Sequence, residues 1–151
     1  MQAIATYEAL ERFLGEDLAR FDGVPPIDHP ALRIGYLGDR VIASIQLGDA
    51  DAARVGCLIL LKDPALPFGK LVKSGLARVL RQRMELLSSA QKDAIGAKTA
   101  ELLSLEFCPR EVEDYCRLVR KFGQAAAVAV ADAARPVNPK ALRLQAYLTE
   151  G

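Results

Sequence analysis

The residue best suited to covalent chemistry in this 151-residue sequence is Cys108, whose thiol stands at the start of a predicted helix. Pro109 and Arg110 follow it, and the positive end of a helix dipole lowers the pKa of a thiol. A reactive thiol also needs a nearby base, and the one histidine of the chain, His29, is remote in the sequence. We therefore favour a packed, structural Cys108 over a reactive thiol.

The run from Ser89 to Lys92 has the Ser-x-x-Lys spacing of serine acylases, in which a helix start holds the nucleophile near an amine. The Lys-Thr-Gly that accompanies this motif is missing. Ser88 and Gln91 form a helix capping box, which accounts for the serines without catalysis. We expect an ordinary helix start here.

Three further features match ligand-binding motifs only in part. Gly69 and Lys70 lack the first glycine and the Ser or Thr of a phosphate-binding loop. Asp49 and Asp51 suit the acidic start of a helix better than a metal site. A single histidine, His29, excludes a histidine-rich metal site. The sequence therefore predicts a protein that is not an enzyme and that needs no metal or cofactor.

Positive charge gathers in the middle of the chain, where residues 62–92 hold seven basic side chains and two acidic ones. The candidate binding residues are the basic side chains of the helix predicted there: Lys70, Lys73, Arg78, Arg81 and Arg83. The first four share a face, whereas Arg83 points to the apolar side, as Lys98 does in the next helix. A basic stripe can contact phosphates, but no aromatic residue interleaves with it and no recognition helix accompanies it. We favour a solvated face, or docking of the acidic N-terminal part, over nucleic-acid binding.

The composition is that of one helical domain spanning residues 1–151. Apolar residues make up 51% of the chain, aromatic ones only 6%, and tryptophan is absent, so the core must consist of Leu, Ala, Val and Ile. An odd number of cysteines, three, argues against a disulfide framework and indicates a reducing compartment. The longest apolar run, residues 55–61, is far shorter than the roughly 20 residues of a membrane helix. We expect a cytoplasmic protein that does not enter the membrane.

Apolar residues three and four positions apart predict the helices that carry these side chains. The predicted ranges are 3–21, 52–61, 65–87, 89–106, 108–134 and 140–148, with Asp49 or Asp51, Ser88 and Asn138 as N-caps. Helix 52–61 is apolar nearly all round and is expected at the centre of the core. Helix 65–87 is expected to turn one face to the core: Phe68, Leu71, Val72, Leu76, Val79, Leu80 and Leu87. Helix 108–134 is amphipathic at first, and its alanine-rich second half is expected to be buried on several sides.

Residues 31–47 allow two interpretations. Gly38 and Asp39, between two apolar runs, are compatible with the turn of a β-hairpin over about 32–47. They are also compatible with two short helices broken at Gly38, with Asp39 as the N-cap of the second. We favour the helices because the downstream chain is helical and a lone hairpin is marginal without a partner sheet.

Long helices joined by short turns pack as antiparallel neighbours. The predicted pair 76–87 and 90–105, followed by 112–134, resembles stacked helix pairs of the HEAT or armadillo kind, and this resemblance implies a binding surface and no catalytic centre. We expect an all-α fold of antiparallel helix pairs, stacked as a bundle or a short α-solenoid, with an α+β fold containing the hairpin as the alternative. The expected function is a non-enzymatic interaction or scaffold domain that binds another protein or itself. Weak, sequence-independent nucleic-acid binding through helix 65–87 is the alternative function.

Overall fold

The computed structural model describes residues 3–23 and 28–150, and every regular element in these two ranges is a helix. The α-helices are, in chain order, α1 (Tyr7–Leu14), α2 (Pro30–Gln46), α3 (Ala50–Lys62), α4 (Gly69–Gln82), α5 (Ser89–Leu103), α6 (Val112–Lys121), α7 (Gln124–Ala133) and α8 (Pro139–Thr149). Short 3-10 turns follow α1 (Ala19–Phe21) and α4 (Met84–Leu86). The predicted all-α fold is confirmed, and the alternative hairpin over 32–47 is wrong.

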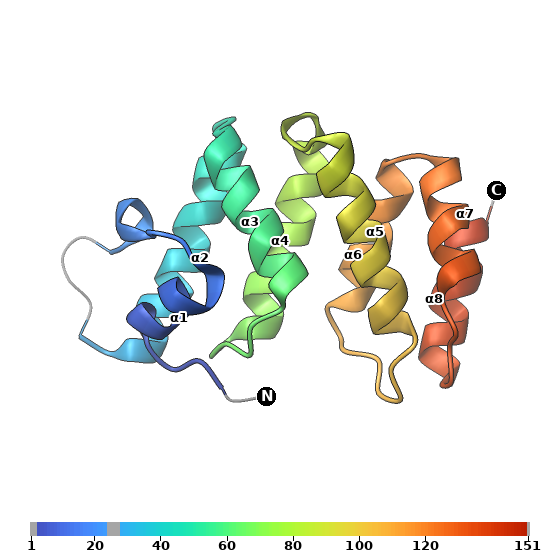
Figure 1. Cartoon of the computed structure of the whole chain (residues 1–151), viewed down its shortest axis with the longest axis horizontal. Coiled ribbons are helices and arrows are strands. Elements are labelled where there is room, and N and C mark those ends of the chain that lie inside the picture. Colours follow the sequence, from blue (N-terminus) through green and yellow to red (C-terminus); the bar gives the residue numbers. More distant parts are fainter. Residues whose placement is uncertain (1–2, 24–27, 151) are drawn as a thin grey trace.

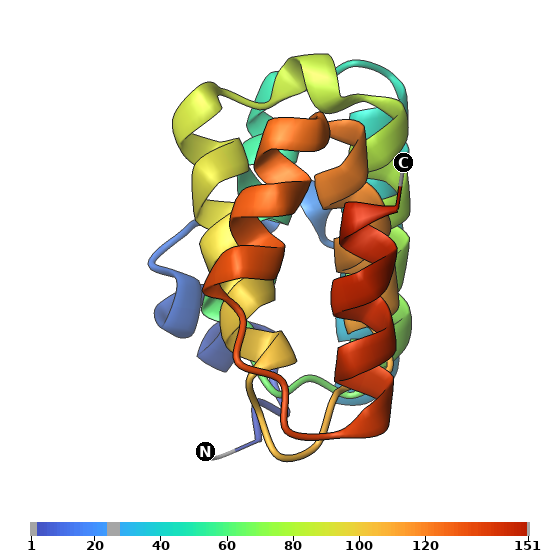
Figure 2. The ribbon, with the colours of Figure 1, turned by 90° about the vertical axis from the view of Figure 1, so that its right-hand side faces the viewer.

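The helices stack in two layers, which Figure 1 shows face-on and Figure 2 shows from one end. The front layer holds α3, α5 and α7, and the back layer holds α2, α4, α6 and α8. In the back layer α4 contacts both α2 and α6, and in the front layer α5 contacts both α3 and α7. The short helix α1 packs on α2 and α3. This order of packed helices is compatible with a helical repeat.

The core lies between the two layers and is mainly aliphatic. Its largest fully buried side chains include Leu10, Ile34, Leu37, Ile45, Ile59, Leu60, Leu76, Leu80, Ile95 and Tyr115. The predicted central position of residues 52–61 is confirmed, because α3 contacts α1, α2, α4 and α5. None of the helices that the structure describes is long and apolar enough to cross a membrane.

Three helix starts follow from the capping residues that the sequence contains. The side chains of Asp49, Ser88 and Asn138 each accept the backbone N–H three residues later, at 2.8 to 3.1 Å. At Ser88 the capping box is complete, since the Gln91 side chain accepts the Ser88 N–H at 2.8 Å. The predicted starts of α3, α5 and α8 are therefore confirmed to within two residues, whereas α5 ends at Leu103, before the predicted residue 106.

The first helix is shorter than the predicted range 3–21. It ends at Leu14 because Gly15 takes a left-handed backbone conformation (φ 70°) and donates its N–H to the Glu11 carbonyl, a common helix C-cap. The Glu11 carboxylate then accepts the N–H of Leu18 at 2.8 Å. These two bonds turn the chain away from the helix axis.

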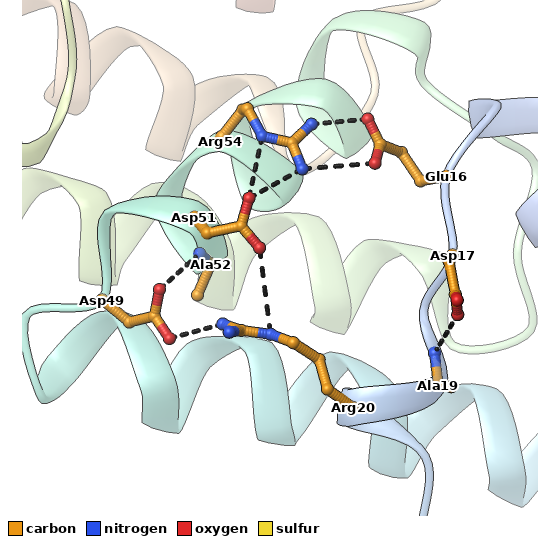
Figure 3. A network of polar contacts seen from close by, with 8 residues as sticks. All are labelled: Glu16, Asp17, Ala19, Arg20, Asp49, Asp51, Ala52 and Arg54. Carbon is orange, nitrogen blue, oxygen red and sulfur yellow. Dashed lines mark hydrogen bonds and ion pairs between the residues drawn. The ribbon is translucent and has the colours of Figure 1, made fainter.

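Arginine–carboxylate pairs hold the segment after α1 on the start of α3 (Figure 3). Arg20 bonds to Asp49 and lies 3.9 Å from Asp51, and Arg54 bonds to Glu16 and, at 2.7 Å, to Asp51. The pKa of Asp49 is lowered by the backbone N–H that it caps and then by Arg20. Glu16, Asp49 and Asp51 are therefore paired with arginines beside α3 and not with the basic helix.

The helix α2 runs without a break through Gly38, against the prediction of two short helices. A Cβ atom on Gly38 would lie 3.0 Å from both γ-carbons of Val72, so this glycine lets α2 approach α4 closely. Gly75 serves the same contact from the other side, because a Cβ there would lie 2.8 Å from Ile42. Close packing of two helices explains both Gly75 and Gly38, of which Gly38 together with Asp39 had suggested a turn or a helix break.

The predicted helix 108–134 is two helices in different layers. Cys108 precedes the start of α6 at Val112, and the chain reverses at Gly123, whose φ of 122° only glycine adopts readily. The alanine-rich part becomes α7, in which Ala125 and Ala129 are exposed and only three residues are buried. The expected burial of this part on several sides is wrong, because α7 lies near the end of the stack (Figure 2).

Candidate binding surface

The five candidate basic residues do not form one free stripe. Lys73 is only 6% exposed, and its ammonium lies 2.6 Å from the Asp63 carboxylate. Arg78 remains exposed but pairs with Asp114 at 3.2 Å. Lys70 and Arg81 have no ion-pair partner in the described ranges. With Arg83, which bonds to the end of α2, three of the five are in internal or helix–helix contacts.

The position of Arg83 on the apolar side of its helix has a structural explanation. Its guanidinium donates to the Gln46 carbonyl at 2.7 and 3.1 Å and pairs with Glu85 at 3.1 Å. Gln46 is the last residue of α2, where carbonyl groups lack helical partners and a cation complements the dipole. Arg83 therefore fastens the end of α2 to the end of α4.

Lys98, the other cation predicted on an apolar face, joins a partly buried ion cluster. Its ammonium lies 3.7 Å from Asp63, which also holds Lys73, and 3.7 Å from Glu101. Asp63 is the C-cap of α3, so this cluster links the end of α3 to α4 and α5. The two cations and two carboxylates balance in charge, so the cluster leaves little charge for a ligand.

Cys108 lacks the setting that a reactive thiol needs. It lies before α6, is 5% exposed, and its pKa is raised by burial rather than lowered by a helix start. His29, the base considered for it, is the exposed N-cap residue of α2. The other two cysteines, Cys57 and Cys116, are also free and buried. The premise of a thiol in the first turn of a helix is therefore wrong.

The buried thiols should make the protein sensitive to alkali. Burial raises the pKa of Cys57 from 9.0 to about 11 and that of Cys116 to about 12. The unfolded chain loses these thiol protons at lower pH than the folded chain does. The stability that the two thiols contribute is therefore fully present below pH 9, and above pH 9 the free energy of unfolding falls by up to about 1.4 kcal/mol per pH unit for each thiol. Urea unfolding at several pH values, followed by circular dichroism, measures this slope. Cys57→Ala should make it shallower, and equal stability at pH 8.5 and 10.5 would contradict the prediction.

The other motifs take structural roles. Ser88 caps α5 with Gln91, and the Lys92 ammonium lies over the Phe122 ring, 5.9 Å from its centre. Asp49 and Asp51 are engaged by arginines. Within residues 3–23 and 28–150, no group of three His, Cys, Asp or Glu side chains could hold a metal ion.

A surface that the sequence did not predict lies between α2 and α4. A hollow of about 290 Å³ there is rimmed by Leu32 and Tyr36 from α2 and by Phe68 and Leu71 from the start of α4. These four side chains are 47%, 52%, 52% and 73% exposed, in that order. Phe68 and Leu71 were predicted to lie in the core, and this prediction is wrong. The apolar face of α4 is wider than the helices packed on it cover.

The backbone of Phe68 supports a special role for this surface. Its φ is +55°, a left-handed conformation that costs a non-glycine residue energy. Its ring lies at the rim of the hollow, where a Cβ atom added to Gly35 of α2 would be 3.6 Å from the Phe68 Cδ2. Strained backbone that persists at a surface hollow is a reason to consider function there.

A second hollow, of about 310 Å³, lies between α5 and α7. Its floor is built mainly from small residues, among them Gly96, Ala97, Ala100, Ala126 and Ala129. Its larger apolar residues, Val119, Phe122 and Val130, are buried or half-buried, so no large exposed side chain stands ready to anchor a partner. The hollow between α2 and α4, termed the α2–α4 hollow below, is the better candidate for a binding surface.

The fold places the chain in a class of proteins built from stacked, packed helices, compatible with a helical repeat. No protein-family model matches the chain, and neither curated proteins nor solved structures give a match. Its resemblance to HEAT and armadillo proteins therefore remains one of pattern.

Proposed function

We propose that the protein is a non-enzymatic interaction domain that binds a partner protein through the α2–α4 hollow. The main support for this proposal is that four large apolar side chains with substantial exposure surround the α2–α4 hollow: Leu32, Tyr36, Phe68 and Leu71. Exposed apolar side chains scattered singly are ordinary, whereas a cluster around a hollow is typical of interaction sites. Aromatic residues of this kind often dominate binding energy.

The energetics favour the same surface. Completing the burial of a half-exposed Leu, Phe or Tyr contributes on the order of 1 kcal/mol per side chain. Leu71 is the most exposed of the four and stands between the hollow and the neighbouring α4–α6 surface. It should therefore be a central contact for a partner.

Site-specific photo-crosslinking tests the proposal. A photoreactive residue at position 71 should form a covalent adduct with a partner in extracts of the native cells. The same residue at position 47 is a matched control, since Leu47 is 86% exposed but lies outside the hollow. Leu71→Asp should weaken partner binding at least tenfold. Equal adducts at both positions, or turnover of a small molecule at this surface, would count against the proposal.

The alternative, nucleic-acid binding through the basic helix, has less support. Lys73 is buried in an ion pair and Arg83 is bonded to α2, so they cannot contact phosphates. A nucleic acid needs several free cations along its path. Only Lys70 and Arg81 meet that condition among the five candidates in the described ranges, and no observation favours this alternative over a protein partner.

A further inference from the structure

We infer that the partner contributes an acidic amphipathic segment, whose apolar side chains fill the α2–α4 hollow and whose carboxylates reach a basic depression between α4 and α6. This inference rests on the proposed function and names the chemistry of the segment that binds. It follows from the charges that border the hollow.

A polar depression adjoins the apolar hollow. It measures about 290 Å³ and is lined by Lys70 and Arg78 from α4 and by Arg110 and Arg117 on the α6 side. Leu71 lines both the hollow and this depression, so the two form one continuous surface across α4. A single extended or helical segment that crosses α4 would contact both.

The depression carries an excess of positive charge. Its two carboxylates are already engaged: Asp114 pairs with Arg78 at 3.2 Å and lies 3.6 Å from Arg117, and Glu113 pairs with Arg117 at 2.7 Å. The remaining cations, Lys70 and Arg110, are exposed and have no ion-pair partner among residues 3–23 and 28–150. These two are therefore available to carboxylates of a partner.

The opposite side of the hollow has the other sign. Asp39 of α2 lines it and is exposed. An acidic residue at this end would be repelled, so carboxylates are expected only toward α6. A bound segment that crosses α4 should then place a neutral or basic residue near Asp39, apolar residues in the hollow, and acidic residues beyond Leu71. A nucleic acid, with its uniform negative charge, would be repelled by Asp39.

Peptide selection tests this order of residues. A phage-displayed library of random 16-residue peptides is selected on the full chain, and enriched peptides are synthesised with a fluorescent label. Their binding is measured by fluorescence anisotropy. We expect two or more large apolar residues followed by Asp or Glu, and weaker binding at high salt because part of the attraction is between exposed charges.

Charge reversal separates the acidic contact from general electrostatics. The double substitution Lys70→Glu with Arg110→Glu should lower the affinity of the protein for the selected peptides at least tenfold. The matched control is Lys121→Glu with Arg143→Glu, which changes the net charge by the same amount. Both positions are exposed and lie outside the α2–α4 hollow and the basic depression, so peptide affinity should change less than twofold. Replacing the peptide's acidic residues with Gln should lower its affinity for the wild-type protein and should not change its affinity for the Lys70→Glu, Arg110→Glu variant.

The outcomes distinguish the inference from the proposed function. Two results would overturn the inference and leave the hollow as a binding site. In the first, the selected peptides bind the Leu71→Asp variant more weakly but show no preference for acidic residues. In the second, both charge-reversed proteins lose affinity for the peptides equally. If no selected peptide depends on Leu71, the hollow is not a peptide site and both fail. A dimer in sedimentation equilibrium that Leu71→Asp dissociates would identify a second copy as the occupant and also overturn the inference.

Discussion

Replacing Asp63 with asparagine is expected to lower the free energy of unfolding by about 3 kcal/mol. Asp63 is the carboxylate shared by Lys73, whose side chain is 8% exposed, and by Lys98, whose side chain is 16% exposed. Without it, Lys73 is left as a buried cation without compensating charge, which costs far more than the loss of a surface ion pair.

Asparagine is the informative substitution because it removes the charge and preserves the backbone. Asp63 has a left-handed φ of 52°, which asparagine tolerates, and its N–H caps α3 by donating to the Ile59 carbonyl at 3.0 Å. Chemical denaturation of wild type and variant measures the difference. Adding Lys73→Met should restore much of the lost stability, because the unpaired charge is then removed.

Glu113→Gln is a matched control for the loss of an ion pair at the surface. It removes the carboxylate that Arg117 meets at 2.7 Å, with both side chains more than 40% exposed. The expected cost is below about 1 kcal/mol. Equal losses for Asp63→Asn and Glu113→Gln would show that the cluster around Asp63 is not effectively buried.

Leu76→Ala is the second large effect, with an expected loss of about 3 kcal/mol. Leu76 is fully buried in α4, where its side chain fills the space left by Gly56 of α3. A Cβ on Gly56 would lie 3.1 Å from the Leu76 Cδ2 and 3.1 Å from the Ile45 Cδ1. Truncation of Leu76 therefore opens a cavity where α2, α3 and α4 meet.

A double-mutant cycle gives this prediction a sharper test. Gly56→Ala alone should cost about 1 kcal/mol, because crowding of two buried methyl groups exceeds the gain in helix propensity. In the Leu76→Ala background the same methyl group should be neutral or stabilising, since it enters the cavity. Denaturation of the four proteins measures the coupling. Additive losses would show that Gly56 and Leu76 do not share this space.

The helix ends were predictable where they depend on short-range bonds. Ser88 with Gln91, and Asn138, are capped in the structure as the sequence indicated, because these bonds span three residues and need no other helix. The all-helical fold class was predictable in a similar way, from apolar residues spaced three and four positions apart and from prolines at helix boundaries. Glycine was ambiguous: Gly38 lies inside a continuous helix, whereas Gly123 separates two. The first is required by contact with Val72 and the second by its own backbone angle, and a sequence pattern does not distinguish these causes.

The candidate surface required the tertiary structure. From the sequence of one helix, Lys73 was equivalent to Lys70, Leu71 was equivalent to Leu76, and Arg83 differed only in pointing to the apolar side. In the structure Asp63 pairs with Lys73 and the end of α2 binds Arg83, whereas Leu76 is covered and Leu71 is not. The sequence by itself determined that the chain is helical, where several helices begin and which residues carry charge or apolar surface. Only the packing of helices distant in the sequence decided which side chains are neutralised, buried or left free to bind, because burial and pairing depend on neighbours from other helices.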